Sequence, residues 1–526
     1  MQTKFSTSIL LYFVLLINFS IAQTGFQKTY GGAFDERGFS VNQTTDKGFI
    51  IAGYTNSYGA GMNDFYLIKS DSLGNPVWSK TYGGTKDDEA YSVKQTTDGG
   101  FIIAGYSNSF GAINYDAYLV KTDAMGDTLW TKTYGGINSD FANSVQQTTD
   151  GGFILAGYTT SFVSSPDSGN IYLIKTDANG NLSWSKSLGG AINISDGYSV
   201  KQTTDKGYIV TGYTNSFGEP NGDVILFKTD SMGIVSWTKT YGSLGLDWGN
   251  SIKQTTDGGY IIAGSASFDS TNLVDVYLIK TNAIGDTLWT KTYGGIGYDF
   301  GQSVEQTTDG GYIITGYTNS CDTCNYNAYL IKTDINGNLL WSSTNGGKGD
   351  DEGNYVHQTT DGGYIVAGVT NSYGTGDYDF YVIKTDANGI SCNQANFTNV
   401  KKSPPTMQNN QTMQLYPANT SLHYINTLLD TGNITTDICY PLGIKSLSEN
   451  QPLIKVFPNP TNGTFTLQIN NFNEENVIVS IENNLGETVY SNLSKEINLQ
   501  NLTSGTYFLH VKSFDNMYSQ KIILIK

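Results

Sequence analysis

The chain has 526 residues and a formal net charge of −17, with 30 Lys and Arg against 47 Asp and Glu. Nucleic acid and anionic lipid both reward positive charge, so this balance excludes a nucleic-acid-binding protein and argues against an anionic membrane partner. Charged residues make up only 15% of the chain, whereas Gly (61) and Tyr (36) are abundant, which is typical of an all-β, turn-rich protein.

The N-terminus has the pattern of a secretory signal peptide, which we assign to residues 1–22. Lys4 precedes an apolar run over residues 9–17, and Ser20-Ile21-Ala22 offers small residues for cleavage. The run is shorter than the roughly 20 residues of a membrane span, and no other apolar stretch is long enough. We therefore expect an exported chain with no transmembrane segment after cleavage; an uncleaved anchor is the alternative.

A repeat of about fifty residues fills positions 26 to about 390. Tryptophans mark its copies at spacings of 52, 54, 53, 52 and 52 residues, and Phe26 stands where a further one would fall. This period, with strand-like pieces and turn residues inside it, is typical of propellers and solenoids. The six marker residues are Trp78, Trp130, Trp184, Trp237, Trp289 and Trp341.

The second copy predicts four antiparallel strands, at residues 90–95, 101–106, 117–121 and 129–134. The first alternates polar and apolar residues, and the second is almost continuously apolar, as expected for a strand that is covered on both faces. Asp-Gly-Gly and similar turn sequences separate the strands. Such a four-stranded meander is one blade of a propeller.

The chain ends favour a ring over an open solenoid. The last repeat lacks its fourth strand, whereas residues 25–32 form a fourth strand that belongs to no repeat. Pairing these fragments removes both free edges, while an open array would need distinct polar caps. The predicted fold is all-β: a seven-bladed β-propeller over residues 23–392, whose N-terminal strand closes the last blade, followed by a small C-terminal β-sandwich.

The repeats resemble a family of secreted β-propeller repeats with the pattern Trp-x-Lys-x-Tyr-Gly-Gly, then Asp, then Asp-Gly-Gly and Ala-Gly-Tyr-Thr-x-Ser. The resemblance covers residues 26 to about 390. It implies the propeller fold and implies no particular activity, because such repeats occur in many unassigned surface proteins.

The two rims of the predicted ring differ in how far the copies agree. Gln-Thr-Thr-Asp recurs seven times in the first turn, and the third turn is nearly as uniform. The second loop, which shares the other rim with the connections between blades, drifts freely. Loops on a rigid scaffold carry binding, so the variable rim is a candidate ligand-binding face; drift without function is the alternative.

An Asp recurs in every connection between blades, and a second series opens most of the third strands, at Asp64, Asp116, Asp223, Asp275 and Asp379. These carboxylates could line the variable rim and gather Ca²⁺. Accepting backbone N–H bonds from nearby turns is the simpler role, and sevenfold recurrence favours it. The rim candidates of the first series are Asp35, Asp88, Asp140, Asp196, Asp247, Asp299 and Asp351.

No catalytic motif is visible, and the carboxylates that stand apart from the repeat are Glu89, Glu219, Glu305 and Glu352. We therefore expect a non-catalytic binding or adhesion propeller with a glycan or protein ligand and no cofactor, Ca²⁺ excepted. The alternative is a polysaccharide hydrolase or lyase with its site at the channel mouth. A structural surface-layer component is the third possibility.

Four cysteines are expected to form disulfides, because that is the usual state of cysteine in a secreted chain. Cys321 and Cys324 share one loop, whereas Cys392 and Cys439 flank a separate segment. A zinc site would require these distant pairs to converge. Residues 393–453, rich in Asn, Thr, Ser and Pro, are predicted to be an irregular extension and linker, with two or three short strands leaning on the propeller.

Residues 454–526 read as about seven strands of a small β-sandwich. They resemble the C-terminal sorting domain (type A) of the type IX secretion system of Bacteroidetes. This resemblance implies export across the outer membrane by that machinery, with the tail often cleaved, and hence a secreted or cell-surface protein. The alternative is a small carbohydrate-binding or adhesion sandwich. The matching residues are Pro458, Asn459, Pro460, Gly463, Gly486, Gly505, Tyr507 and Lys526.

Overall fold

The computed structural model describes residues 25–165, 168–190, 193–219, 221–267, 273–320 and 325–392, and further along the chain strands β29 to β39 with residues 499–504. The chain divides into two compact units, residues 1–440 and 441–526. The predicted signal peptide lies outside the described residues. Among those residues, no helix has the length and apolar character needed to cross a membrane.

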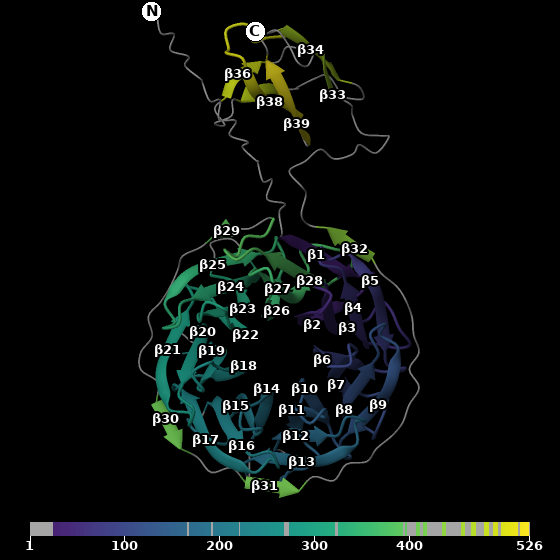
Figure 1. Cartoon of the computed structure of the whole chain (residues 1–526), viewed down its shortest axis with the longest axis vertical. Helices are drawn as coiled ribbons and strands as arrows, with labels where there is room; N and C mark the ends of the chain where they lie inside the picture. Colours follow the sequence, from purple (N-terminus) through teal and green to yellow (C-terminus); the bar gives the residue numbers. More distant parts are fainter. Residues whose placement is uncertain are drawn as a thin grey trace, which may run out of the picture. The chain divides into compact units, whose positions relative to one another are not determined.

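The first unit contains seven four-stranded antiparallel sheets that resemble propeller blades and are arranged around a central opening (Figure 1). The innermost strands are β2 (Glu36–Gln43), β6 (Asp88–Gln95), β10 (Asp140–Gln147), β14 (Ser195–Gln202), β18 (Asp247–Gln254), β22 (Asp299–Gln306) and β26 (Asp351–Gln358). The second strands are β3 (Phe49–Thr55), β7 (Phe101–Ser107), β11 (Phe153–Thr159), β15 (Tyr208–Thr214), β19 (Tyr260–Ala266), β23 (Tyr312–Thr318) and β27 (Tyr364–Thr370).

The outer half of each sheet is built in the same way. The third strands are β4 (Asp64–Ser70), β8 (Asp116–Thr122), β12 (Asn170–Thr176), β16 (Asp223–Thr229), β20 (Asp275–Thr281), β24 (Asn327–Thr333) and β28 (Asp379–Thr385). The outermost strands are β5 (Pro76–Tyr82), β9 (Thr128–Tyr134), β13 (Leu182–Gly189), β17 (Val235–Gly242), β21 (Thr287–Tyr293), β25 (Leu339–Asn345) and β1 (Phe26–Gly31).

Strand β1 completes the seventh sheet from the other end of the chain. It pairs with β28 in antiparallel register, with Thr29 opposite Tyr381. The incomplete repeats at the two ends of the array predict this pairing. A backbone hydrogen bond also joins the seventh sheet to the first, from Glu36 N to Tyr378 O at 2.7 Å.

The marker tryptophans form the joints between sheets. Trp78 packs on Gly126 of the next sheet, where an added Cβ would lie 2.9 Å from the indole, and Tyr82 donates its hydroxyl proton to the Gly126 carbonyl at 2.7 Å. Phe26 takes the tryptophan's place against Gly74, with an added Cβ 2.7 Å from its ring. The regular spacing of the tryptophans in the sequence therefore reflects a contact that recurs between neighbouring sheets.

The uniform turns are explained by two repeated contacts. Asp46 accepts from Lys69 at 2.9 Å in an ion pair that recurs in all seven sheets. Burial alone would raise the pKa of Asp46, but hydrogen bonds from Thr44 and Lys69 lower it to about 2. Each turn also donates a backbone N–H to a glutamine of the next inner strand, including Thr360 of the last sheet to Gln43 of the first at 2.8 Å.

The segment after the repeats adds a fifth strand to four of the sheets, each antiparallel to an outermost strand. Two or three short strands are expected there from the sequence, and the described residues of the segment form four. They protect outer edges that would otherwise expose unpaired backbone groups. These strands are β29 (Ala395–Asn396) on β25, β30 (Met407–Asn410) on β17, β31 (Gln414–Pro417) on β13 and β32 (Ile434–Asp437) on β1.

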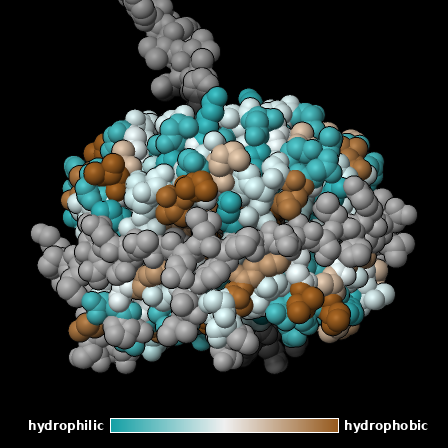
Figure 2. All heavy atoms as spheres, turned by 90° about the horizontal axis from the view of Figure 1, so that it is seen from below, coloured by the Kyte–Doolittle hydropathy of each residue, from teal (hydrophilic) through white to brown (hydrophobic). Residues whose placement is uncertain are grey.

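Exposed apolar side chains of the first unit form separate patches. Met125 and Leu129, near the third turn, are 60% and 58% exposed, and Ile137 in a connection is 75% exposed. In the view toward β31 such patches lie apart from one another among polar residues (Figure 2). Among the residues that this view colours, no single continuous apolar face is visible.

The described residues of the second unit form seven strands in two antiparallel sheets, of three and four strands. Ile497 of the smaller sheet packs in one core with Val479, Ile481 and Leu509 of the larger, so the two sheets share a core. The strands are β33 (Ile454–Phe457), β34 (Thr464–Ile469), β35 (Ile478–Glu482), β36 (Thr488–Asn492), β37 (Glu496–Asn498), β38 (Gly505–Ser513) and β39 (Asn516–Leu524).

Candidate binding site in the central cavity

A β-bulge in every inner strand decides which side chains face the centre. In β6 the register shifts between Ala90 and Ser92, so Tyr91 has no partner in β7. The same shift occurs at the same place in the other six inner strands. A bulge re-aims the side chains around it. The fourth, fifth and seventh residues of these strands consequently supply most of the wall of a central cavity of about 380 Å³, a size suited to a small ligand.

The fourth residues contribute both aromatic rings and side-chain amides to the wall. Phe39 and Tyr91 stack with ring centroids 4.7 Å apart. Asn250 and Asn354 donate their side-chain N–H groups to backbone carbonyls of the next sheet at 2.8 and 2.9 Å. Because those bonds use the amide nitrogens, the amide oxygens keep their capacity to accept hydrogen bonds.

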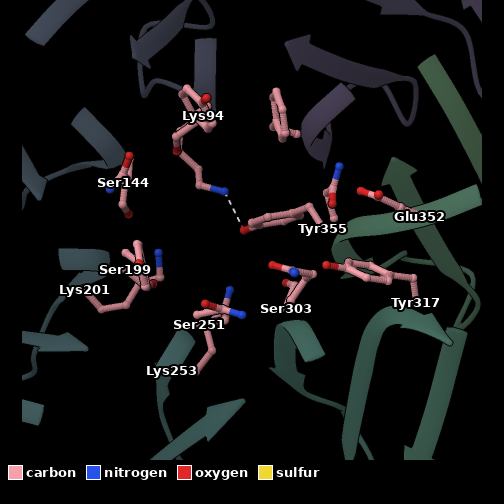
Figure 3. A pocket seen from close by; sticks show the side chains of 18 residues that line it. Lys94, Ser144, Ser199, Lys201, Ser251, Lys253, Ser303, Tyr317, Glu352 and Tyr355 are labelled. Atoms are coloured by element: carbon pink, nitrogen blue, oxygen red, sulfur yellow. Dashed lines mark hydrogen bonds between the residues drawn. The ribbon is translucent and has the colours of Figure 1, made fainter. Parts of the chain in front are cut away.

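The fifth residue is Ser in six inner strands and Tyr355 in β26. Ser40 accepts a hydrogen bond from Val93 N of the next sheet at 3.2 Å, and four further serines do the same. Tyr355 breaks this series with a bulky ring. It extends across the cavity, where Lys94 Nζ donates to its hydroxyl at 2.7 Å (Figure 3).

The seventh residues make one end of the cavity basic. Lys94, Lys201 and Lys253 all line it, and they enter from three different strands (Figure 3). Glu305 lies 3.7 Å from Lys253 Nζ and 3.0 Å from His357 Nδ1. Three lysine amines and one carboxylate therefore lie close together within a strongly acidic protein.

Burial shifts the ionisation of this cluster. Desolvation, followed by the charge of Lys253, lowers the pKa of Lys94 to about 7, and the same causes lower the pKa of Lys201 to about 7. Burial would also lower the pKa of Lys253, but Tyr355 and Glu305 raise it. For Glu305 burial would raise the pKa, but Lys253 and His357 lower it to about 2. Lys253 and Glu305 are thus both charged at neutral pH.

The second residues of the inner strands lie toward the variable rim, one residue after the start of each strand. Glu89 accepts from Asn63 at 2.8 Å and from Tyr91 at 3.1 Å, and burial raises the pKa of Glu352. Of the carboxylates that stood apart in sequence, the structure thus places Glu89 and Glu352 at one end of the inner strands and Glu305 at the other. Glu219 lies outside, in the loop before β16.

The predicted rim of aspartates requires a correction. Asp88, Asp140, Asp247, Asp299 and Asp351 are the first residues of inner strands and are 0–1% exposed. Their Oδ2 atoms accept from backbone N–H groups four residues earlier, as from Gly84 at 2.8 Å in the case of Asp88. These side chains are therefore not available at the surface. They stabilise the connections between sheets by accepting backbone hydrogen bonds, which is the simpler role that their sevenfold recurrence favours.

The remaining two members of that series occupy different positions. In their own sheets, Glu36 and Ser195 occupy the position that Asp88 has in the second sheet. Asp35 therefore lies one residue before that position, and Asp196 lies one residue after it. Asp35 forms an ion pair with Arg37 at 3.3 Å and is partly exposed. Burial raises the pKa of Asp196 to about 7, and the carboxylate accepts from Asn143 at 3.1 Å.

The second aspartate series is also structural. Asp64 accepts from Ala60 N at 2.8 Å, and its other oxygen lies 1.8 Å from the position of a Cβ added to Gly83. That oxygen therefore packs closely against the glycine backbone. Desolvation, opposed by backbone hydrogen bonds, raises the pKa of Asp64 to about 6. Among the described residues, no group of three or more His, Cys, Asp or Glu side chains is placed to hold a metal.

Most of the remaining predicted residues lie outside the described part of the chain. Cys392 is disulfide-bonded, whereas Cys321, Cys324 and Cys439 are not described, so the pairings stay predictions. Gly505 opens β38, and Tyr507 is buried and donates to the Thr503 carbonyl at 2.8 Å. The other sorting-domain residues are not described: Pro458, Asn459, Pro460, Gly463, Gly486 and Lys526.

The basic end of the cavity could have been found in the sequence. The residue before the constant Gln-Thr-Thr-Asp turn differs among the seven copies, although both flanks are uniform. Such variation on a buried strand differs from drift in a loop, because a strand position must still fit its neighbours. The seven residues are Asn42, Lys94, Gln146, Lys201, Lys253, Glu305 and His357.

Comparisons with known proteins bear mainly on the C-terminal unit. Residues 455–526 match the family model described as a secretion system C-terminal sorting domain. The chain therefore carries a sorting domain of the type IX secretion system and is exported to the cell surface or beyond it. Among curated proteins, the regulatory protein FlaEY of Caulobacter vibrioides is 27% identical over 138 residues, which cover 23% of this chain and 14% of that relative.

Solved structures that are similar to the chain have low sequence identity. Sqt1 from Chaetomium thermophilum is 10% identical, with a TM-score of 0.39, over 68% of this chain and 98% of that one. The β-1,2-mannobiose phosphorylase from Listeria innocua is 11% identical, with a TM-score of 0.27, over 68% of this chain and 91% of its own. These scores carry no argument about activity.

Proposed function

We propose that the seven sheets form a closed seven-bladed β-propeller that acts outside the cell as a non-catalytic binding or adhesion module, with a glycan or protein ligand recognised at the central cavity. Delivery rests on the C-terminal sorting domain, through which the type IX machinery is the expected partner. The propeller thus presents its cavity to the surroundings of the cell.

One observation carries this proposal: seven nearly identical sheets present unlike side chains to one cavity. Packing explains the uniform residues, because each makes the same contact in every sheet. It does not explain why the fourth position of the inner strands carries aromatic rings in some sheets and amides in others, or why the seventh position carries lysine in only three of them. A small, mostly preformed cavity with a few converging polar groups is the usual form of a ligand site.

The test uses the full-length chain on arrays of glycans and surface proteins, with product analysis of every bound ligand. Specific retention without turnover is expected. Tyr198→Ala, at the fourth position of β14 and in the cavity wall, should weaken retention at least tenfold, whereas Leu129→Ala, on an outermost strand and 58% exposed, serves as the matched control. Equal retention by both variants would place the ligand elsewhere, and released product would establish the hydrolase or lyase alternative.

A further inference from the structure

One end of the cavity is basic, although the chain as a whole is acidic. The net charge of the protein is −17, yet Lys94, Lys201 and Lys253 line the same small cavity. Like charges at close range repel, and burial strengthens that repulsion. Folding alone does not require lysine at the seventh position of an inner strand. Asn42 and Gln146 occupy this position in other sheets and have neutral side chains.

The charged partners available to these lysines are too few. Lys94 donates to two neutral oxygens, Asn42 Oδ1 at 2.9 Å and the Tyr355 hydroxyl at 2.7 Å. Lys253 faces Glu305 at 3.7 Å, which is longer than a strong charge-assisted hydrogen bond. Within the sheets that the structure describes, Lys201 Nζ makes no hydrogen bond or ion pair. The cluster therefore has one carboxylate for three amines.

That single carboxylate is also engaged elsewhere. Glu305 Oε2 lies 3.0 Å from His357 Nδ1 and accepts from Gln358 N at 2.8 Å. These two contacts hold Glu305 against its neighbouring strand. An added anion among the lysines would consequently not have to displace Glu305.

We infer that Lys94, Lys201 and Lys253 form an anion subsite of the cavity, which takes the carboxylate or sulfate group of a small acidic sugar. This inference rests on the proposed function and names its ligand class. The neighbouring wall suits the sugar ring: the stacked Phe39 and Tyr91 offer apolar surface for its C–H groups, and the amide oxygens of residues such as Asn250 can accept from its hydroxyls.

The experiment is isothermal titration calorimetry on the full-length protein at low salt, with sodium glucuronate, sodium sulfate and glucose as probes. Glucuronate should bind and glucose should bind at least tenfold more weakly. Lys201→Met and Lys253→Met should each weaken glucuronate at least tenfold, and thermal unfolding should show that both variants remain folded. Lys86→Met removes the same charge from an exposed connection and should leave binding unchanged.

Each outcome of these titrations supports or overturns the anion subsite. Competition between sulfate and glucuronate supports one shared anion subsite, whereas sulfate binding without glucuronate binding overturns the assignment to a sugar. Equal affinity for glucuronate in Lys86→Met and Lys201→Met, or no glucuronate binding, overturns the subsite. If retention of a neutral ligand from the arrays still depends on Tyr198 of the cavity wall, the proposed function survives that failure. If no ligand depends on the cavity, both proposals fail.

Discussion

At the scale of single residues, the glycine beneath each marker tryptophan should be among the least replaceable positions. Gly126 has a φ of +78° and a Cβ there would lie 2.9 Å from Trp78. Gly99 has a φ of +85°, and an added Cβ would meet nothing within 4 Å. Both glycines occupy the left-handed region that penalises other residues, but only Gly126 is also tightly packed.

We therefore predict that Gly99→Ala lowers the free energy of unfolding by about 1 kcal/mol. Gly126→Ala should lower it by about 1–3 kcal/mol more, because the added methyl group overpacks the joint between sheets. Denaturant titration of the two variants measures the difference. Equal losses would mean that Trp78 does not pack on this turn.

The lysines of the cavity predict the pH dependence of anion binding. Burial lowers the pKa of Lys94 and Lys201 to about 7, so both lose their charge as pH rises through neutrality, well below the ordinary value for lysine near 10.4. An anion binds the protonated form. Its affinity should therefore be highest below pH 7 and fall between about pH 7 and 9, with proton uptake on binding.

Calorimetry in buffers of different ionisation enthalpy measures that proton uptake directly. Lys253 and Glu305 stay charged across this range, because the pKa of Lys253 is raised and that of Glu305 is about 2. His357→Gln is the control, since loss of the histidine should leave the decline above pH 7 in place. An affinity that stays constant from pH 6 to 9 would contradict the predicted lysine ionisation. Tyr355 and His357 are the other titratable groups beside the lysines.

At the scale of strands, the sequence predicted the elements well and their cavity-facing side chains poorly. The first strand of the second copy was expected at 90–95 and runs from Asp88 to Gln95. Its β-bulge at Tyr91 was not predicted, because a bulge depends on pairing with β7 and leaves no signature in a simple alternation. Without the bulge the sequence does not show that the fourth and fifth residues face the cavity, whereas the seventh is marked by its variation before the constant Gln-Thr-Thr-Asp turn.

Strand β1 offers a test of how the two ends of the repeat array are held together. Thr29 lies opposite Tyr381 of β28 on one side and Thr436 of β32 on the other. Thr29→Pro removes the backbone N–H from the ladder and leaves an unpaired acceptor, at a cost of about 1–3 kcal/mol. Thr29→Val keeps the N–H and should be much closer to the native stability. Chemical denaturation that ranks the two variants equally would argue against the pairing of β1 at both edges.

At the scale of the whole molecule, the sequence was most informative where residues repeat and least informative where they differ. Seven similar copies revealed the sheets, because each tryptophan and glycine makes the same joint. The cavity depends on differences among equivalent positions such as Lys201 and Glu305, whose convergence only the arrangement of the sheets reveals. The extension after residue 392 was expected to lean on the propeller, but the outermost strands that it pairs with could not be predicted from its short, polar strands.

Export is the property of the whole chain that a single deletion can test. The match to the sorting-domain family covers residues 455–526, and the two units are separately compact. Removing residues 454–526 should therefore leave the first unit folded but retained in the periplasm, with the surface fraction reduced to the background of a strain that lacks the secretion machinery. Cell fractionation with surface proteolysis measures this.

The reciprocal experiment separates sorting from folding. Fusing residues 441–526 to a periplasmic reporter should carry the reporter to the cell surface, because the second unit has its own core around Val479, Ile481 and Leu509. Tyr507 lies in that core and donates to the Thr503 carbonyl, so Tyr507→Ala should lower export of the fusion through loss of folding, whereas Tyr507→Phe keeps the ring and loses only the hydrogen bond. Full export of the alanine variant would show that the machinery reads a linear segment and does not require the folded unit.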